Sequence, residues 1–167
     1  YNLARFIHFD RDNFREALDV LELLIMYYPK KQYWVQASHL YGEEKDEARQ
    51  LALLEATYEQ NLLDRSQDIV LISQLYLQAE VPYPAARAME KGLIDDIVEK
   101  ESKNYELAGV AWRQAQEVTK SLPMLEAAAS KSEKGELYAR LGNVYLDVDK
   151  NKAVSYTHLR AHETTRH

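Results

Sequence analysis

The chain has 167 residues, of which 46% are hydrophobic and 29% charged, and its formal net charge at pH 7 is −6. This acidic balance, without any cluster of Lys and Arg, argues against nucleic acid as a partner, because phosphate binding needs a basic surface. No apolar run approaches the ~20 residues of a membrane span. Cysteine is absent, which excludes disulfides, thiolate metal sites and a cysteine nucleophile. Glycine and proline are sparse, at 5 and 4 residues, so the composition favours helices.

The first predicted helix runs from Phe14 to Tyr27. The polar turn at residues 10–13 supplies Asp and Asn capping residues before it, and Pro29 ends it. A second polar turn, at residues 42–46, joins the next pair of helices.

Prolines mark two later helices. In the stretch 81–84 one helix ends, and Pro84 falls in the first turn of another, where its missing N–H costs little. Pro123 falls inside an expected helix, so we expect it to kink that helix or to delay its start. The last predicted helix spans Glu136–Asp147.

A short pattern recurs four times along the chain. An aromatic or aliphatic residue is followed, after two residues, by an apolar or small pair and, after two more, by an aromatic residue. The closing aromatic residues of successive copies lie 35, 36 and 33 residues apart. The four copies are Trp34-x-x-Ala37-Ser38-x-x-Tyr41, Ile69-x-x-Ile72-Ser73-x-x-Tyr76, Tyr105-x-x-Ala108-Gly109-x-x-Trp112 and Tyr138-x-x-Leu141-Gly142-x-x-Tyr145.

A second set of positions recurs in phase with the first. A small residue is expected, then a large apolar residue four positions later, and another small or apolar residue three positions after that. Gln50 and Ser121 depart from the alanine expected at the first of these positions. The four sets are Ala17, Leu21 and Leu24; Gln50, Leu54 and Thr57; Ala85, Met89 and Gly92; and Ser121, Leu125 and Ala128.

These patterns in register resemble the tetratricopeptide-repeat (TPR) family. The resemblance covers about residues 1–152 and implies an all-α fold, a right-handed superhelical solenoid of antiparallel helix pairs. It implies that residues 1–152 divide into a partial repeat at 1–31, repeats at 32–64, 65–100 and 101–133, and the first helix of a further repeat at 134–152.

The spacing has a physical reason. The small residues Ser38, Ser73, Gly109 and Gly142 are expected to let the two helices of a pair approach closely. The aromatic residues, seven positions apart on one helical face, are expected to fill the seam between them. Each pair then leaves an apolar side that only the next pair covers, so stacking builds a continuous core.

The last residues, 153–167, do not continue the pattern. The stretch 154–164 resembles a translated sequencing adaptor, so we interpret 153–167 as a non-native tail and expect the native protein to continue at both ends. The tail places His158 and His162 beside Glu163, a spacing that offers two imidazoles to zinc. The residue order does not match a metalloprotease, and the adaptor explains the whole string, so we expect no metal site.

No catalytic constellation stands out in the rest of the chain. His8 falls at the closing-aromatic position of the first repeat, where we expect it to pack in the seam, and His39 lies in a different repeat. No Gly-rich phosphate loop occurs, and paired carboxylates such as Asp95 and Asp96 are expected to be solvated. We therefore expect neither an enzyme nor a cofactor.

The concave surface of a TPR protein is lined by the outer flank of each first helix, so the resemblance places partner binding there. Val35, Val70, Glu106 and Ala139 occupy the row where chaperone-cofactor TPR domains carry the Lys and Asn that bind a terminal carboxylate. The face instead mixes amides and aliphatic groups, which suits an extended backbone or a partner helix; alternatively, any one of its residues is merely solvent-facing. The predicted partner-binding residues are Gln36, His39, Val70, Gln74, Gln78, Val110, Arg113, Arg140 and Asn143.

A narrower similarity rests on several runs, at 72–77, 81–87, 90–93, 104–108 and 135–142. They resemble a group of bacterial TPR proteins that accompanies TonB-type energy-transduction genes in Gram-negative bacteria. The similarity implies a periplasmic, non-catalytic accessory of the TonB–ExbB–ExbD system. The absence of cysteine suits the cytoplasm equally well.

Two other functions stay open. The chain is alternatively a docking or regulatory TPR segment of a larger enzyme, such as a glycosyltransferase or a peptidase. Self-association through the last helix, which lacks the second helix of its pair, is the third possibility.

Overall fold

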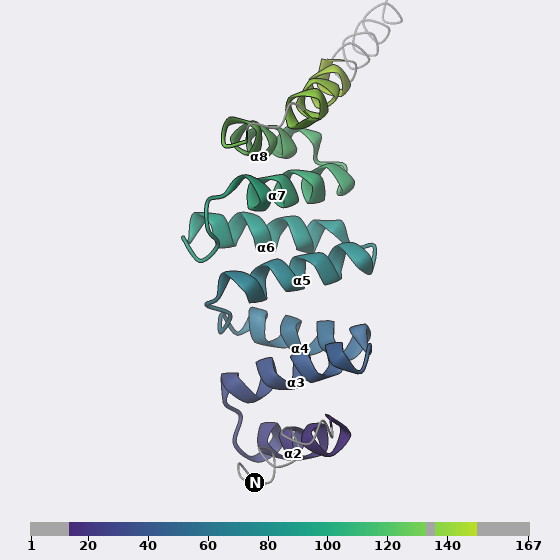
Figure 1. Ribbon diagram of the computed structural model, residues 1–167, viewed down its shortest axis with the longest axis vertical. Helices are drawn as coiled ribbons and strands as arrows, with labels where there is room; N and C mark the ends of the chain where they lie inside the picture. The colour runs from purple at the N-terminus through teal and green to yellow at the C-terminus, as the bar shows by residue number, and fades with distance from the viewer. Residues whose placement is uncertain (1–13, 133–135, 150–167) are drawn as a thin grey trace, which may run out of the picture. The chain divides into compact units, whose positions relative to one another are not determined.

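The computed structural model describes residues 14–132 and 136–149, and all regular structure in these two ranges is α-helical. The described residues fall into two compact units, 14–76 in the first and 77–132 with 136–149 in the second, and Figure 1 shows their helices. Its helices are α2 (Phe14–Tyr27), α3 (Lys31–Glu43), α4 (Glu47–Glu59), α5 (Ser66–Gln78), α6 (Pro82–Ile94), α7 (Ser102–Gln114) and α8 (Val118–Ser130), followed by a C-terminal helix over residues 136–149.

In the first unit, α3 packs against α2 on one side and against α4 on the other. Successive helices run in opposite directions because turns of only a few residues join them (Figure 1). The predicted second-helix residues Ala17, Leu21 and Leu24 are buried in one apolar cluster with Ala37 and Tyr41 of α3. The cluster unites both recurring sequence patterns in a single core.

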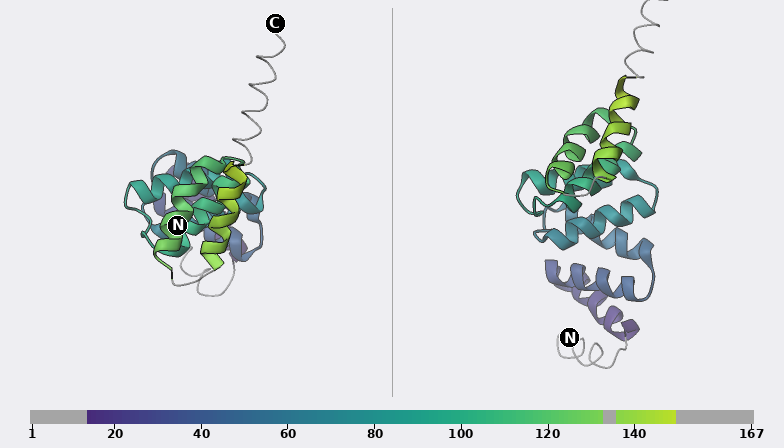
Figure 2. Two further views of the ribbon diagram at one scale, coloured as in Figure 1. Left: turned by 90° about the horizontal axis from the view of Figure 1, so that it is seen from above. Right: turned by 45° about the horizontal axis from the view of Figure 1, so that its top comes forward.

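In the second unit, α7 packs against both α6 and α8. The C-terminal helix lies beside α8 (Figure 2), where Leu137 is buried with Ala128 and Ala129. Tyr105 of α7 and Leu141 pack against this cluster. Each added helix therefore extends the core of the unit along the stack.

The predicted close approach of paired helices is confirmed at Gly109. A β-carbon built there would lie 2.6 Å from Cγ of Leu125 and 3.3 Å from its backbone nitrogen, so α8 leaves no room for a side chain. Ser38 and Ser73 are fully buried, and each hydroxyl donates a hydrogen bond of 2.8 Å to a carbonyl of its own helix. At Gly142 nothing lies within 4 Å, so no described helix makes the corresponding contact.

Gln50, the largest departure from the sequence pattern, has a compensating partner. Its side chain is buried, and Nε2 would lie 2.5 Å from a β-carbon at Gly42 of α3. Glycine at position 42 therefore makes room for the glutamine that replaces the expected alanine.

The closing aromatic residues Tyr41, Tyr76 and Trp112 are buried, as predicted. In the C-terminal helix Tyr138 and Tyr145 do not fill a seam, since they are 54% and 44% exposed. No helix of the described ranges covers the side of the C-terminal helix on which Gly142 opens, so these rings lack one wall of the seam.

The turns of the described residues are unusual because none of them uses a glycine at a positive φ. The second residue after each of five helices adopts a positive φ, between 54° and 63°. After α3, for example, the Lys45 N–H bonds to the Gly42 carbonyl and the Asp46 N–H to the Tyr41 carbonyl, a Schellman-type ending. These left-handed residues are Lys45, Asn61, Glu80, Asp96 and Gln116.

The predicted bounds of α2 are confirmed, and every described residue of the C-terminal range 136–149 is helical, including the predicted span to Asp147. The predicted delay at Pro123 is wrong, since α8 begins at Val118 and continues through it. Proline removes only the N–H that would bond to the Thr119 carbonyl, and both residues are exposed, so water can satisfy this group. The predictions for His8 and for the tail 153–167 lie outside the described residues.

Close packing at Gly109 and open space at Gly142 predict opposite effects of the same substitution. Gly109→Ala should lower the free energy of unfolding by roughly 1–3 kcal/mol, because Leu125 cannot move aside without strain. Gly142→Ala should raise it by up to about 1 kcal/mol through helix propensity alone. Urea unfolding followed by circular dichroism measures both, and equal shifts of the two midpoints would contradict the assigned packing.

Candidate functional site

Each of the two units has an open pocket among its described residues. The first, of about 530 Å³, is called here the α2–α3 groove and is lined by Arg15, Leu18, Asp19, Glu22, Tyr41, Glu44, Asp46 and Arg49. The second, of about 440 Å³, is called the α7 pocket and is lined by Val110, Arg113, Gln114, Gln116, Leu125 and Arg140.

The α7 pocket is assembled by helical periodicity. Val110, Arg113 and Gln114 lie three and four residues apart on α7, so they share one face of the helix. Leu125 of α8 is almost fully buried and contributes the apolar base together with Val110. Arg140 reaches the pocket from the C-terminal helix.

Arginines give the α7 pocket a positive lining. Arg113 is 3.1 Å from Asp147, and Arg140 is 2.6 Å from Glu106 and 3.0 Å from Glu136. None of these carboxylates lines the pocket itself. Because a guanidinium carries five N–H donors, each arginine retains donors for an acceptor placed in the pocket.

Three of the nine predicted site residues, Val110, Arg113 and Arg140, are thus brought together. The other six line neither pocket. Val70 is half-buried, whereas the remaining five are exposed on helices, namely Gln36, His39, Gln74, Gln78 and Asn143. Partner binding by all nine stays a prediction.

His39 has a contact that the sequence did not indicate. Its Nε2 lies 3.7 Å from Oδ1 of Asp68, a carboxylate in the first turn of α5 that is only 2% exposed. The other oxygen, Oδ2, has no hydrogen-bond partner. His39 therefore contacts α5 through one edge of its ring, while about half of its side chain is exposed.

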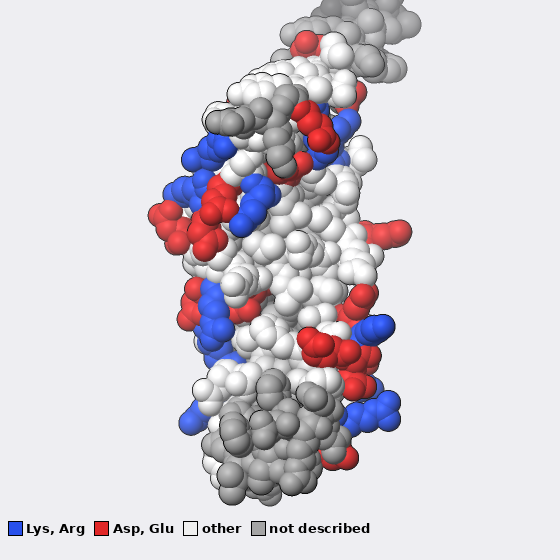
Figure 3. Space-filling model, in the orientation of Figure 1, with Lys and Arg blue, Asp and Glu red and all other residues white. Residues whose placement is uncertain are grey.

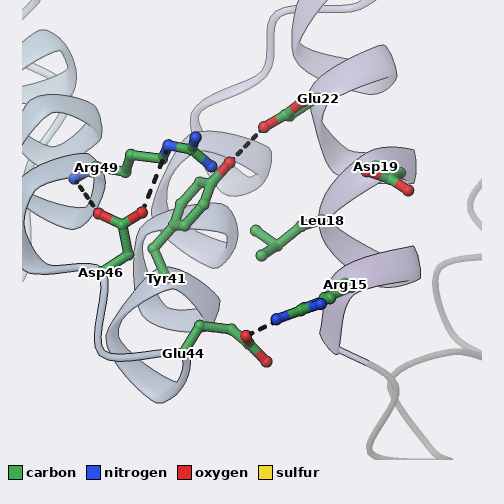
Figure 4. A pocket seen from close by; sticks show the side chains of 8 residues that line it. All are labelled: Arg15, Leu18, Asp19, Glu22, Tyr41, Glu44, Asp46 and Arg49. Carbon is green, nitrogen blue, oxygen red and sulfur yellow. Dashed lines mark hydrogen bonds and ion pairs between the residues drawn. The ribbon is translucent and has the colours of Figure 1, made fainter.

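The α2–α3 groove is built from three helices (Figure 4). Leu18 points from α2 toward the ring of Tyr41, and both side chains are largely buried. Arg15 pairs with Glu44 at 3.6 Å, and Arg49 pairs with Asp46 at 3.5 Å. The Arg49 guanidinium also lies 5.4 Å from the centre of the Tyr41 ring, within cation–π range.

A tyrosine–glutamate hydrogen bond recurs between neighbouring repeats. The hydroxyl of the closing tyrosine donates a hydrogen bond to a glutamate 19 or 21 residues earlier, which lies on the helix before it in the chain. The pairs are Tyr41 with Glu22, Tyr76 with Glu55 at 2.9 Å, and Tyr145 with Glu126. The spacing of these glutamates was visible in the sequence but was not used.

The closing aromatic residue of α7 is Trp112, which has no hydroxyl and makes a different contact. Trp112 is fully buried, its Nε1 has no hydrogen-bond partner, and Tyr83 meets its ring edge-on at 5.4 Å between centroids. Lys120 lies 4.5 Å from the Trp112 ring centre. An edge-to-face aromatic contact and a cation–π contact take the place of the tyrosine–glutamate bond here.

On the face drawn in Figure 3, Lys and Arg are interspersed with Asp and Glu. Among the described residues no group of three or more His, Asp or Glu side chains could hold a metal ion. Across the same ranges, none of the helices has the length and apolarity required to cross a membrane.

Antiparallel helices stacked through small residues define the class of fold, an all-α solenoid of the TPR type. The solved structures that share it include MamA from Desulfovibrio magneticus RS-1, residues 41 to the end, with a TM-score of 0.63 and 15% identity over 99% of this chain and 94% of that one. Another MamA crystal structure matches with a TM-score of 0.62 and 13% identity over 95% and 94% of the two chains. AMB-1 MamA matches with a TM-score of 0.65 and 14% identity over 95% and 86%.

MamA is a TPR-like helical solenoid, so the predicted fold class is confirmed. No protein-family model and no curated protein sequence matches the chain. The narrower resemblance to TonB-associated proteins finds no support in these structures and stays a prediction.

The Tyr76 hydrogen bond predicts a specific loss of stability at alkaline pH. Burial, and then the hydrogen bond to Glu55, raise the pKa of the Tyr76 hydroxyl above the unfolded value of about 10. The neutral hydroxyl therefore stabilises the fold fully below about pH 10, and this contribution is lost as the pH rises toward the folded pKa. Tyr76→Phe should cost about 1 kcal/mol at pH 8, and its difference from wild type should shrink above about pH 10.

Urea unfolding at pH 8 and pH 10.5 measures the free energies of unfolding of Tyr76→Phe and wild type. Groups that titrate in both proteins contribute equally, so they cancel in the difference between the two. Tyr28→Phe, which removes an exposed hydroxyl, is the control and should match wild type at both pH values. A Tyr76→Phe difference that stays constant with pH would rule out the proposed contribution.

Proposed function

We propose that the chain is a non-catalytic scaffold that binds a segment of a partner protein in the α7 pocket. The observation that carries the proposal is the union of Val110, Arg113 and Arg140 in one open pocket. These residues come from the first-helix face on which partner binding was predicted. The TPR-type fold supports a protein-binding role, since helical repeats present extended surfaces to other proteins.

The lining of the pocket indicates the chemistry of the partner. It contains two guanidinium groups and two amides but no carboxylate, above an apolar base of Val110 and Leu125. An acidic side chain next to an apolar one fits both features, because a guanidinium binds a carboxylate through two parallel hydrogen bonds.

A partner carboxylate would have to take the place of a carboxylate that now pairs with an arginine of the pocket. Side-chain exposure is 41% for Arg113 and 43% for its partner Asp147, and solvent-exposed pairs typically contribute only about 0–1 kcal/mol. A partner carboxylate can therefore replace Asp147 at small cost. The partner segment binds either as a helix in the groove or as an extended chain.

A component of the TonB–ExbB–ExbD system is one candidate partner. Its support is the sequence resemblance alone, and the same resemblance is the only basis for a periplasmic location. The chemistry of the α7 pocket does not depend on that assignment.

Removing the two arginines tests the proposal. Twelve-residue peptides that combine Glu or Asp with Leu, Ile or Phe are screened by fluorescence anisotropy against the whole chain. For a peptide that binds, Arg113→Gln with Arg140→Gln should weaken affinity at least 10-fold, since loss of a charged hydrogen bond costs about 1.5–3 kcal/mol.

A matched control separates the pocket from general charge. Arg87→Gln with Lys103→Gln removes the same charge from exposed positions of the second unit that do not line the pocket, and should change affinity less than 3-fold. Equal weakening by both double variants, or no peptide that binds, would refute the proposal.

A further inference from the structure

The α2–α3 groove belongs to the first unit and shares no residue with the α7 pocket. We propose that this groove binds a Lys or Arg side chain from a basic segment of a partner protein. The inference does not rest on the function of the α7 pocket, because it concerns different helices and the opposite charge.

The groove has the size and the apolar base that a long basic side chain requires. Its volume of about 530 Å³ lies within the usual range of binding pockets, about 300–1,000 Å³. Leu18 and the ring of Tyr41 face each other across it (Figure 4). The methylene stem of Lys or Arg can lie along such apolar groups while its charged end stays at the rim.

The charges of the lining favour a cation. Four carboxylates line the groove, against two guanidinium groups. Arg15 is matched by Glu44 and Arg49 by Asp46, which leaves the charges of Asp19 and Glu22 without a basic partner in the lining.

Glu22 is held in place by Tyr41. The Tyr41 hydroxyl donates a hydrogen bond to it, and burial, followed by this bond, raises the pKa of that hydroxyl. The proton therefore stays on Tyr41, and the oxygens of Glu22 have further acceptor capacity. Asp19 lies three residues earlier on the same helix, so the two carboxylates are neighbours on its surface.

The groove already accommodates a cation of the proposed kind. Arg49 of the chain itself lies over the Tyr41 ring at 5.4 Å and beside the Asp46 carboxylate. An aromatic ring flanked by carboxylates is thus stable here with a guanidinium against it. On the α2 side a partner's side chain would find apolar Leu18 beside the carboxylates of Asp19 and Glu22.

The experiment uses the whole chain and a fluorescent eight-residue peptide in which Lys alternates with Leu. Binding is measured by anisotropy for this peptide and for one in which each Lys is acetylated, which keeps the stem but removes the charge. The proposal predicts binding of the first peptide and at least 10-fold weaker binding of the second. Equal binding of both peptides, or no binding of either, would overturn it.

Asp19→Asn with Glu22→Gln removes two charges from the groove, and glutamine retains an acceptor for Tyr41. This variant should weaken binding of the Lys peptide at least 10-fold. Glu43→Gln with Glu59→Gln removes the same charge from exposed positions of the first unit outside the groove, and should change affinity less than 3-fold. Equal effects of the two variants would show attraction to the acidic chain as a whole and would refute the site.

Two further measurements keep the outcome interpretable. Asp19→Lys, at an exposed position, should weaken binding of the Lys peptide even if the double variant folds poorly. The acidic peptides of the α7 pocket should bind both groove variants as they bind wild type. Failure of those peptides in the wild-type chain would count against the α7 pocket alone.

Discussion

The rest of the structure depends on close contact between paired helices, at positions where the neighbouring helix leaves no room for a larger side chain. At Gly109 the neighbouring helix approaches so closely that Leu125 occupies the space of a β-carbon. The same Leu125 also lines the α7 pocket. Packing at Gly109 therefore helps to set the position of one wall of the proposed binding pocket.

Polar contacts add direction to this packing. Tyrosine–glutamate bonds connect each closing tyrosine to the helix before it, and in the first unit the same bond holds Glu22 at the rim of the α2–α3 groove. The two pockets are lined by opposite excess charge although the chain as a whole is acidic. Net charge therefore indicates little about the partner of an individual pocket, because short-range charges dominate within a Debye length of about 8–10 Å.

Much of the fold could be predicted because the repeat signature is local. Helix boundaries follow from prolines, polar turns and the spacing of apolar residues, all of which act within a few turns of helix. Pro123 was misjudged because its effect depends on exposure: a proline on a solvated face removes one hydrogen bond that water can replace. Tyr145 is partly exposed because its burial requires a covering helix, and no helix of the described residues lies on that side.

The candidate sites were predictable only in part. The sequence identified Val110, Arg113 and Arg140 from their place on the first-helix face. That they line one pocket depends on the position of Leu125 of α8, which the sequence did not indicate. Gln50 departs from the repeat pattern in the sequence, and only the structure places Gly42 of α3, eight residues earlier, against its side chain. Asp68 reads as an ordinary acid in a first turn, and its burial beneath His39 arises only from packing between helices.

The most direct test of this close-packing constraint is a double-mutant cycle at Gly42 and Gln50, with free energies of unfolding measured in urea. If glycine at 42 exists to accommodate the glutamine, Gly42→Ala should be clearly more favourable in the Gln50→Ala background than in wild type. An interaction energy of about 0.5–1.5 kcal/mol is then expected. Additivity of the two substitutions within about 0.3 kcal/mol would contradict it.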